Sequence, residues 1–229
     1  MLPPVARLGK CPVRCHMRKM KRRTLLVSAL LLPVAAQAQP RFQPSVQDRA
    51  DLARIETYLN GLRSLQARFI QIAPNGQLAS GTAWLSRPGR MRLEYFPPTP
   101  FLLIAGNGLL IFHDVKLKQT TQIFLGQTPL GILLADNVKL SGGVTVLEIR
   151  REPNMLEVWL TRTTSPGDGS IALIFADNPL ALRQWTVLDA QRQETRVTLS
   201  NVELGGSFDR KLFEFVDPNL FATDPNRGN

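Results

Sequence analysis

Few residues in this sequence could carry out acid–base or nucleophilic chemistry. His113 precedes Asp114 at the end of an apolar run, and the chain has two histidines in all. A histidine–carboxylate pair supports hydrolysis when a serine nucleophile stands in a G-x-S-x-G turn, and the sequence contains no such turn. We therefore interpret His113 as a strand-end histidine beside a turn aspartate. The sequence predicts no catalytic residue and no enzyme activity.

Metal and phosphate sites also lack the residues that they need. The two cysteines, Cys11 and Cys15, lie ahead of an apolar segment near the N-terminus, and no D-x-D-x-D-G calcium loop occurs. The glycines in "GNG", "SGG" and "GGS" are not followed by Lys-Ser or Lys-Thr, so they predict turns and not phosphate-binding loops. We expect no metal and no cofactor.

One charged residue stands out by its position. Arg87 occurs in "WLSRPGRMRLEY", after an apolar stretch and directly before the Pro-Gly of a predicted turn. A guanidinium carries five N–H donors in a planar fork and can bind several carbonyl oxygens. From the residues alone, two interpretations of Arg87 stay open: a surface charge beside a turn, or a donor that holds neighbouring backbone.

The N-terminal residues have the pattern of a secretory signal. A basic stretch precedes an apolar run that ends in Ala36-Gln37-Ala38, which supplies the small residues of a cleavage site. The run is too short for a transmembrane helix, which needs about 20 apolar residues. We expect residues 1–38 to be a cleaved signal peptide that takes the protein to the periplasm, with residues 1–16 as a possible upstream extension. Arg22-Arg23 matches the twin-arginine export pattern loosely, but an ordinary general-export signal is the simpler interpretation.

Removal of this signal changes the charge of the chain. Residues 1–38 hold eight of the 28 Lys and Arg residues and no Asp or Glu, so 20 basic side chains remain against 18 acidic ones. The net charge falls from +10 to +2, which gives no reason to expect nucleic-acid binding. Residues 39–229 then contain no cysteine, and they are long enough to fold as a single, monomeric domain without disulfides.

The remaining pattern is mainly β. Helical spacing over 48–62 predicts one amphipathic helix, and "TPLGILL" predicts a short second helix. Strand patterns separated by turn signals fill most of the rest, beginning with a hairpin through Asn75-Gly76 and ending with a strand in "FDRKLFEFVDPN". We expect ten or eleven short strands in one antiparallel meander, either open or closed.

Several strands are apolar on both faces, as in "FLLIAGNGLLIF" and "SIALIF". A single antiparallel sheet normally alternates, because one face meets the core and the other meets water. A two-sheet sandwich or a closed barrel would bury both sets. Helices over the mouth of a curved sheet would instead enclose an apolar cavity for acyl chains. The strand pattern alone does not decide between these two arrangements.

The order of motifs resembles the LolA-type periplasmic lipoprotein carriers. The resemblance runs from about residue 48 to 218 and is most specific in 81–134, where "GTAWLSRPGRMRLEY", "LLIAGNGLLIFHDVKLKQTTQ" and "TPLGILL" follow one another. It implies an unclosed antiparallel β half-barrel whose apolar concave face is lidded by α-helices. The segment "GNGLLI" and the residues after it depart from the family pattern, which puts partner recognition in question.

The resemblance also implies a function and partners. Such carriers take acylated lipoproteins from an inner-membrane lipoprotein-releasing transporter and deliver them to an outer-membrane lipoprotein receptor, with acyl chains held in the cavity. In this family the arginine of the W-x-x-R-P motif holds the lid closed, so Arg87 is expected to be the lid latch. We expect the acyl-chain cavity to be lined or capped by Leu52, Ile55, Leu59, Trp84, Met91, Leu93, Leu103, Ile111, Ile132, Leu133 and Trp159.

Three other functions stay open at this point. A periplasmic lipid sensor or regulator could use the same half-barrel, and a carrier could handle a lipid that is not part of a protein. An esterase-like enzyme would need a nucleophile beside a base, for which His113 is the one candidate.

Overall fold

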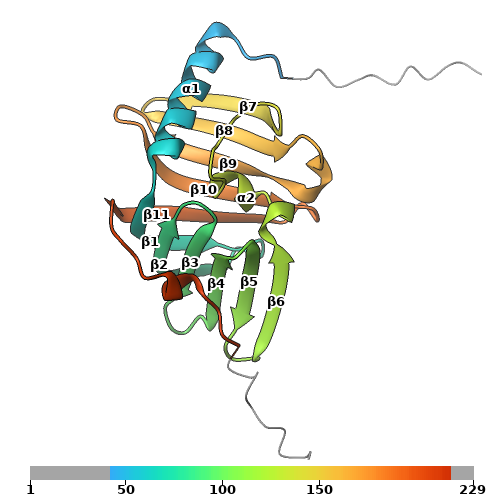
Figure 1. The fold of residues 1–229 in the computed structure, drawn as a ribbon. Coiled ribbons are helices and arrows are strands. Elements are labelled where there is room, and N and C mark those ends of the chain that lie inside the picture. Colours follow the sequence, from blue (N-terminus) through green and yellow to red (C-terminus); the bar gives the residue numbers. More distant parts are fainter. Residues whose placement is uncertain (1–41, 218–229) are drawn as a thin grey trace, which may run out of the picture. The chain divides into compact units, whose positions relative to one another are not determined.

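The computed structural model describes residues 42–217, so the predicted signal peptide (1–38) lies outside the described residues. Eleven antiparallel strands form one sheet in the order β6-β5-β4-β3-β2-β1-β11-β10-β9-β8-β7 (Figure 1). Because β6 and β7 form the two edges and do not pair with each other, the sheet does not close into a barrel. The prediction of a mainly β fold with an unclosed antiparallel sheet and few helices is confirmed.

The helices are α1 (Val46–Gly61) and α2 (Leu130–Leu133), with short 3-10 helices η1 (Leu125–Gln127), η2 (Pro166–Asp168) and η3 (Arg210–Phe213). The strands are β1 (Ser64–Ile72), β2 (Leu78–Ser86), β3 (Arg90–Tyr95), β4 (Phe101–Gly106), β5 (Leu109–Asp114), β6 (Gln119–Phe124), β7 (Val144–Glu152), β8 (Met155–Arg162), β9 (Gly169–Ala176), β10 (Ala181–Asp189) and β11 (Glu194–Leu204).

The sheet is built from two meanders and not from the single one expected. Strands β1–β6 form the first meander and β7–β11 the second, and they join where β1 pairs antiparallel with β11. In this junction Phe69 lies opposite Leu199, although 130 positions separate them in the chain. No local turn signal connects these two strands, which is why the sequence pattern did not predict the junction.

Two strand predictions were wrong. The edge strand β6 was not predicted, because its sequence "QTTQIF" is mostly polar and five of its six residues are exposed, so it lacks the alternation of a half-buried strand. The final strand predicted in "FDRKLFEFVDPN" does not form. That segment contains η3, and residues 214–217 have no regular secondary structure.

The segment 205–217, which we call the C-terminal strap, explains why the strands of the first meander are apolar on both faces. It leaves β11 and crosses the outer face of β3, β4 and β5 (Figure 1). Arg92 of β3 donates from Nη1 to the carbonyl of Leu212 at 3.2 Å, and the His113 ring of β5 lies 5.1 Å from the Phe215 ring. Gly106 approaches the Phe213 carbonyl so closely that a Cβ would clash. The outer face is therefore covered by this chain's own backbone and aromatic rings.

The inner face of the sheet is covered by α1. Ser45 caps this helix in a capping box with Asp48, each side chain bonding the other residue's backbone N–H. Leu52, Ile55 and Leu59 follow at helical spacing and are buried in the main hydrophobic core. Beside them, the Tyr58 ring meets Phe175 of β9 edge-on at 5.7 Å.

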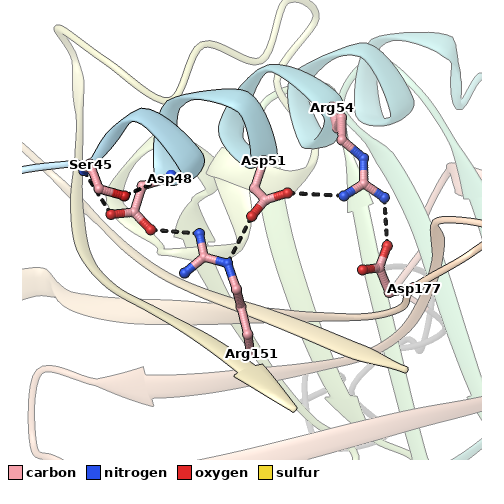
Figure 2. Close-up of polar contacts among 6 residues, drawn as sticks. All are labelled: Ser45, Asp48, Asp51, Arg54, Arg151 and Asp177. Carbon is pink, nitrogen blue, oxygen red and sulfur yellow. Dashed lines mark hydrogen bonds and ion pairs between the residues drawn. The ribbon is translucent and has the colours of Figure 1, made fainter. Parts of the chain in front are cut away.

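A charged network ties α1 to the second meander, as Figure 2 shows. Arg151 of β7 donates from Nη2 to Asp48 at 2.5 Å and from Nε to Asp51 at 2.8 Å. Arg54 bridges Asp51 at 2.9 Å and Asp177, beyond β9, at 2.5 Å. Both helix carboxylates are buried, so each needs the cation that it contacts.

None of the helices within residues 42–217 is long and apolar enough to cross a membrane.

Replacing Arg151 with methionine should lower the free energy of unfolding by about 1–3 kcal/mol, because two buried carboxylates would lose a charge-assisted donor. Arg150→Met is the matched control, since the neighbouring Arg150 is exposed and pairs with Glu148 on the surface at 2.7 Å. We expect the control to change stability much less, because an ion pair exposed to water contributes little to folding. Urea denaturation of the three proteins measures the difference, and equal losses in both variants would contradict the network's role.

The same network predicts a specific acid sensitivity. The hydrogen bond from Arg151, followed by those from Ser45, lowers the pKa of Asp48 from 3.8 to about 2. Because the folded-state pKa is the lower one, this stabilisation is present above pH 3.8 and is lost as the pH falls towards 2. In Arg151→Met the loss of stability between pH 4 and pH 2 should be smaller than in the wild type, as measured by urea denaturation at each pH.

Candidate functional site

A cavity of about 400 Å³ lies between the two meanders on the inner face of the sheet. Its lining comes from both meanders and from the segment that follows β6: Gln71, Met91, Leu93, Leu103, Leu110, Ile123, Gln127, Thr128, Pro129, Leu130, Asp168, Trp185, Val187, Asp189, Ala190, Gln191, Thr195 and Val197. Ligand cavities in proteins span roughly 300–1,000 Å³, so this volume suits a small or narrow ligand.

The floor of the cavity is apolar because inward-facing strand positions meet there. Leu93 of β3 lies opposite Leu103 of β4, and Trp185 of β10 lies opposite Val197 of β11. All four side chains face the cavity, in keeping with the alternation of side chains across a strand. These four positions therefore form an apolar surface on the inner face of the sheet.

The segment 125–140, which we call the lid segment, crosses the inner face and supplies one wall. It contains η1 and α2, and its apolar residues Leu125, Leu130, Ile132 and Leu133 are buried. Pro129 stands before α2, and the Thr128 hydroxyl donates to the Leu125 carbonyl at 2.9 Å, which closes the turn between η1 and α2. With one turn of helix, α2 depends for its position on contacts outside itself.

Arg87 supplies one of these contacts. Its side chain is 6% exposed, and Nη2 donates to the carbonyl of Ala135, just beyond α2. In the same β2–β3 turn, the backbone N–H of Gly89 donates to the Leu134 carbonyl at 2.8 Å. Burial is the main cause that lowers the pKa of Arg87 from its ordinary value, and the nearby Arg63 adds to the shift. The turn therefore binds the lid segment through both side chain and backbone.

A second arginine binds the opposite end of the lid segment. Arg162, the last residue of β8, donates from Nη2 to the Thr128 carbonyl at 3.3 Å. Gly131 of α2 makes room for it, because a Cβ on Gly131 would come within 2.5 Å of Nη2. Arg87 belongs to the first meander and Arg162 to the second, so the lid segment is attached to both halves of the sheet.

The lid segment is also attached to α1. Asn60 bonds the backbone of Val138 twice, accepting from its N–H at 2.8 Å and donating to its carbonyl at 3.0 Å. The Glu56 carboxylate accepts from the backbone N–H of Leu140 at 2.6 Å. Side chains of α1 thus bind the backbone of the lid segment beyond α2.

Some polar side chains at the cavity are hydrogen-bonded. The Tyr95 hydroxyl donates to Gln71 Oε1 at 2.6 Å, and burial raises the pKa of Tyr95. The Asp189 carboxylate accepts from the backbone N–H groups of Gln191 and Gln193 at 2.9 and 2.8 Å. Within residues 42–217 no group of three or more His, Cys, Asp or Glu residues is arranged to hold a metal ion.

The structure distributes the predicted cavity residues over three places. Met91, Leu93 and Leu103 line the cavity. Five others belong to α1 and α2, are buried in the core and do not line the cavity: Leu52, Ile55, Leu59, Ile132 and Leu133. The remaining three, Trp84, Ile111 and Trp159, lie on the outer face, which corrects their assignment.

The neighbours of Trp84 and Ile111 explain why these two side chains point outward. Trp84 faces outward because the inward positions on either side of it are Ala83 and Leu85, both buried. Ile111 pairs with Ile104, and Ile104 pairs with Arg92. Paired residues point to the same face of a sheet, so Ile111 lies on the outer face with Arg92. In a strand that is apolar on both faces, the sequence pattern does not reveal which set points inward.

Trp159 is turned outward between the inward-facing Val158 and Leu160, both fully buried. On the outer face its indole N–H donates to Glu157 at 2.8 Å, which satisfies the polar end of the ring.

Several residues of the site were not predicted. Trp185 could have been found, since it lies in an alternating strand segment. Arg162, Asn60 and Glu56 carry no sequence signal, because each acts through a backbone group that is distant in the chain. His113, considered above as a base, instead bonds Thr120 at 3.0 Å and faces the strap.

Residues 60–216 match the family described as outer membrane lipoprotein carrier protein LolA. An outer-membrane lipoprotein carrier protein of Methylococcus capsulatus is 30% identical over 175 residues, covering 72% of this chain and 83% of its own. One from Dechloromonas aromatica is 29% identical with the same coverage, and one from Halorhodospira halophila is 29% identical over 90% of this chain and 97% of its own.

Among solved structures, a LolA superfamily protein from Nitrosomonas europaea covers 73% of this chain and 97% of its own at 10% identity, with a TM-score of 0.43. A likeness of that size adds nothing to the assignment, which depends on the sequence matches. These cover most of the described fold, including the β2–β3 turn, the lid segment and the strap. The chain belongs to the outer-membrane lipoprotein carrier family, LolA.

Proposed function

We propose that this protein is a periplasmic carrier that holds the acyl chains of lipoproteins in its apolar cavity and moves them from the inner to the outer membrane. The observation that carries the proposal is the cavity of about 400 Å³ with an apolar floor from both meanders, covered by a lid segment that is attached through individual hydrogen bonds. Family membership supports the cargo, because the relatives are named lipoprotein carriers.

A carrier is needed because acyl chains do not cross water unaided. Burying one CH₂ group contributes about 0.8 kcal/mol, so transfer of an acyl chain of about 16 carbons from membrane to water costs about 12 kcal/mol. A cavity lined by Leu93, Leu103 and Trp185 replaces the membrane as an apolar environment. The volume of the closed cavity suits one narrow ligand, so a cargo with several chains requires the lid segment to move.

The attachments of the lid segment favour release. In the closed protein Arg87 and Arg162 donate to lid carbonyls, and these bonds would break when cargo displaces the lid. Their loss subtracts from the affinity for cargo, and their return favours unloading. An apolar cavity without bonds that favour the closed state would bind acyl chains too tightly to pass them on.

The proposed route includes two partners. An inner-membrane lipoprotein-releasing transporter loads the carrier, and an outer-membrane lipoprotein receptor unloads it. The carrier acts as a monomer and performs no chemical reaction on its cargo. Export by the predicted signal (1–38) supplies the periplasmic location.

Native mass spectrometry of the protein purified from a periplasmic fraction tests the proposal directly. We expect a population whose added mass corresponds to an acylated polypeptide. A lipid adduct without polypeptide would favour a carrier of non-protein lipid, and a protein that never carries an acylated species would overturn the proposal.

Substitutions at two adjacent positions of β4 test whether cargo enters this cavity. Leu103 faces the cavity, whereas Leu102 lies on the outer face opposite Glu94 and His113. Leu102 and Leu103 are themselves both partly exposed. Leu103→Gln should weaken binding of a fluorescent acyl probe by about tenfold, because it brings an unpaired amide to the cavity wall. Leu102→Gln should bind the probe like the wild type. Equal affinities for the two folded variants would assign the ligand elsewhere.

Substitution of the two arginines tests the lid attachments. Arg87→Leu and Arg162→Leu should each bind the acyl probe more tightly, by about tenfold or more at Arg87, because a charge-assisted bond contributes about 1.5–3 kcal/mol to the closed state. Arg87→Lys should lie between leucine and wild type, since an ammonium lacks the guanidinium fork. Arg183→Leu, an exposed arginine on β10, is the control.

The double variant Arg87→Leu/Arg162→Leu adds a further check. Because both arginines hold one segment, their effects on probe affinity should not be additive. Transfer of bound lipoprotein from each variant to outer-membrane vesicles should be slower than from wild type. Unchanged affinity and transfer in Arg87→Leu would reduce Arg87 to a structural residue of the turn.

A further inference from the structure

The charged residues that line the cavity are all acidic. Asp168 ends η2 and Asp189 ends β10, and Gly169, the residue after Asp168, pairs with Asp189, so both carboxylates lie at one end of the second meander. Gln71 near the end of β1, Gln191 in the β10–β11 turn and Thr195 near the start of β11 lie at this same end of the sheet and also line the cavity. We call these five residues the rim. A ligand whose chain follows the apolar floor would therefore place its polar end against the rim.

The rim carboxylates have free acceptor capacity. Asp189 uses Oδ1 for the backbone N–H groups of Gln191 and Gln193, which leaves Oδ2 without a partner among residues 42–217. The Asp168 side chain makes no hydrogen bond or ion pair within the same residues, although its backbone N–H donates to Ser165 at 3.1 Å. Both side chains are partly exposed and can turn towards a bound head group.

Two arginines lie near the rim, and neither lines the cavity. Arg162 donates to the Thr128 carbonyl, and Arg192 is an exposed residue of the turn that follows Asp189. Arg196, on the outer face of β11, pairs with Glu194 at 2.9 Å. The cavity therefore presents two carboxylates and no cation to the ligand itself.

We infer that the cavity selects acyl ligands whose head group donates hydrogen bonds or carries positive charge, such as an amide, hydroxyl or ammonium group, and discriminates against anionic carboxylate or phosphate heads. The inference rests on the proposed function for the acyl chain and adds the chemistry of its polar end. Like charges at close range repel in a partly desolvated site, whereas carboxylates accept strongly from N–H and O–H donors.

A displacement assay with amphiphiles of one chain length tests the selectivity. The full protein without its signal peptide is loaded with the uncharged dye N-phenyl-1-naphthylamine, and dodecylammonium, monolaurin or laurate is added below its micelle concentration. We expect dodecylammonium to displace the dye at a concentration at least about tenfold lower than laurate. Monolaurin, which has the same chain and an uncharged hydroxyl head, should also displace the dye more readily than laurate.

Removal of the carboxylates should abolish this order. In Asp168→Asn/Asp189→Asn the preference for dodecylammonium over laurate should fall to within about threefold. Glu203→Gln/Glu214→Gln removes two exposed carboxylates away from the cavity and should keep the wild-type preference. Circular dichroism verifies that both double variants are folded.

The possible failures are distinguishable. Equal displacement by all three amphiphiles in the wild type, or a preference that survives in the double asparagine variant, would overturn the head-group inference and leave the carrier function standing. Absence of dye and amphiphile binding altogether would overturn the proposed function, and the inference with it.

Discussion

The pairing of β1 with β11 is the interaction on which the cavity depends. It joins two meanders that are each continuous in sequence, and it brings Met91 and Leu93 from one to face Trp185 and Val197 from the other. The ladder runs over most of β1 and is interrupted by a register shift between Gln66 and Arg68. Such irregularities bend a strand and increase its twist, which suits a sheet that must curve around a cavity without closing.

An open sheet that is apolar on both faces needs two different covers. On the outer face of β3, β4 and β5 the strap gives a cover that is packed closely against Gly106 and makes aromatic contacts. On the inner face the helices and the lid segment give a cover held through a few side chain–backbone bonds. The outer cover is thus packed against the strands, whereas the inner cover is bonded at separate points.

The two kinds of charge in the structure have separate roles. Near the helix N-terminus, Asp48 and Asp51 are paired with Arg151 and stabilise the position of α1. Around the cavity, the arginines face backbone carbonyls of the lid segment, and the carboxylates of Asp168 and Asp189 keep acceptor positions open. The charges that position α1 are thus paired with each other, whereas those around the cavity are not.

Local patterns in the sequence were enough to predict the helix α1, the strands with turn signals, and the Pro-Gly turn that carries Arg87. The motif order of the sequence also determined the family. The inward-facing side of each strand became known from the fold, because a run such as "FLLIAGNGLLIF" is apolar on both sides and its pattern does not distinguish the two faces. The fold likewise decided the junction of β1 with β11 and the contacts of Arg162, Asn60 and Glu56, since each joins groups far apart in the chain through backbone atoms that every residue possesses.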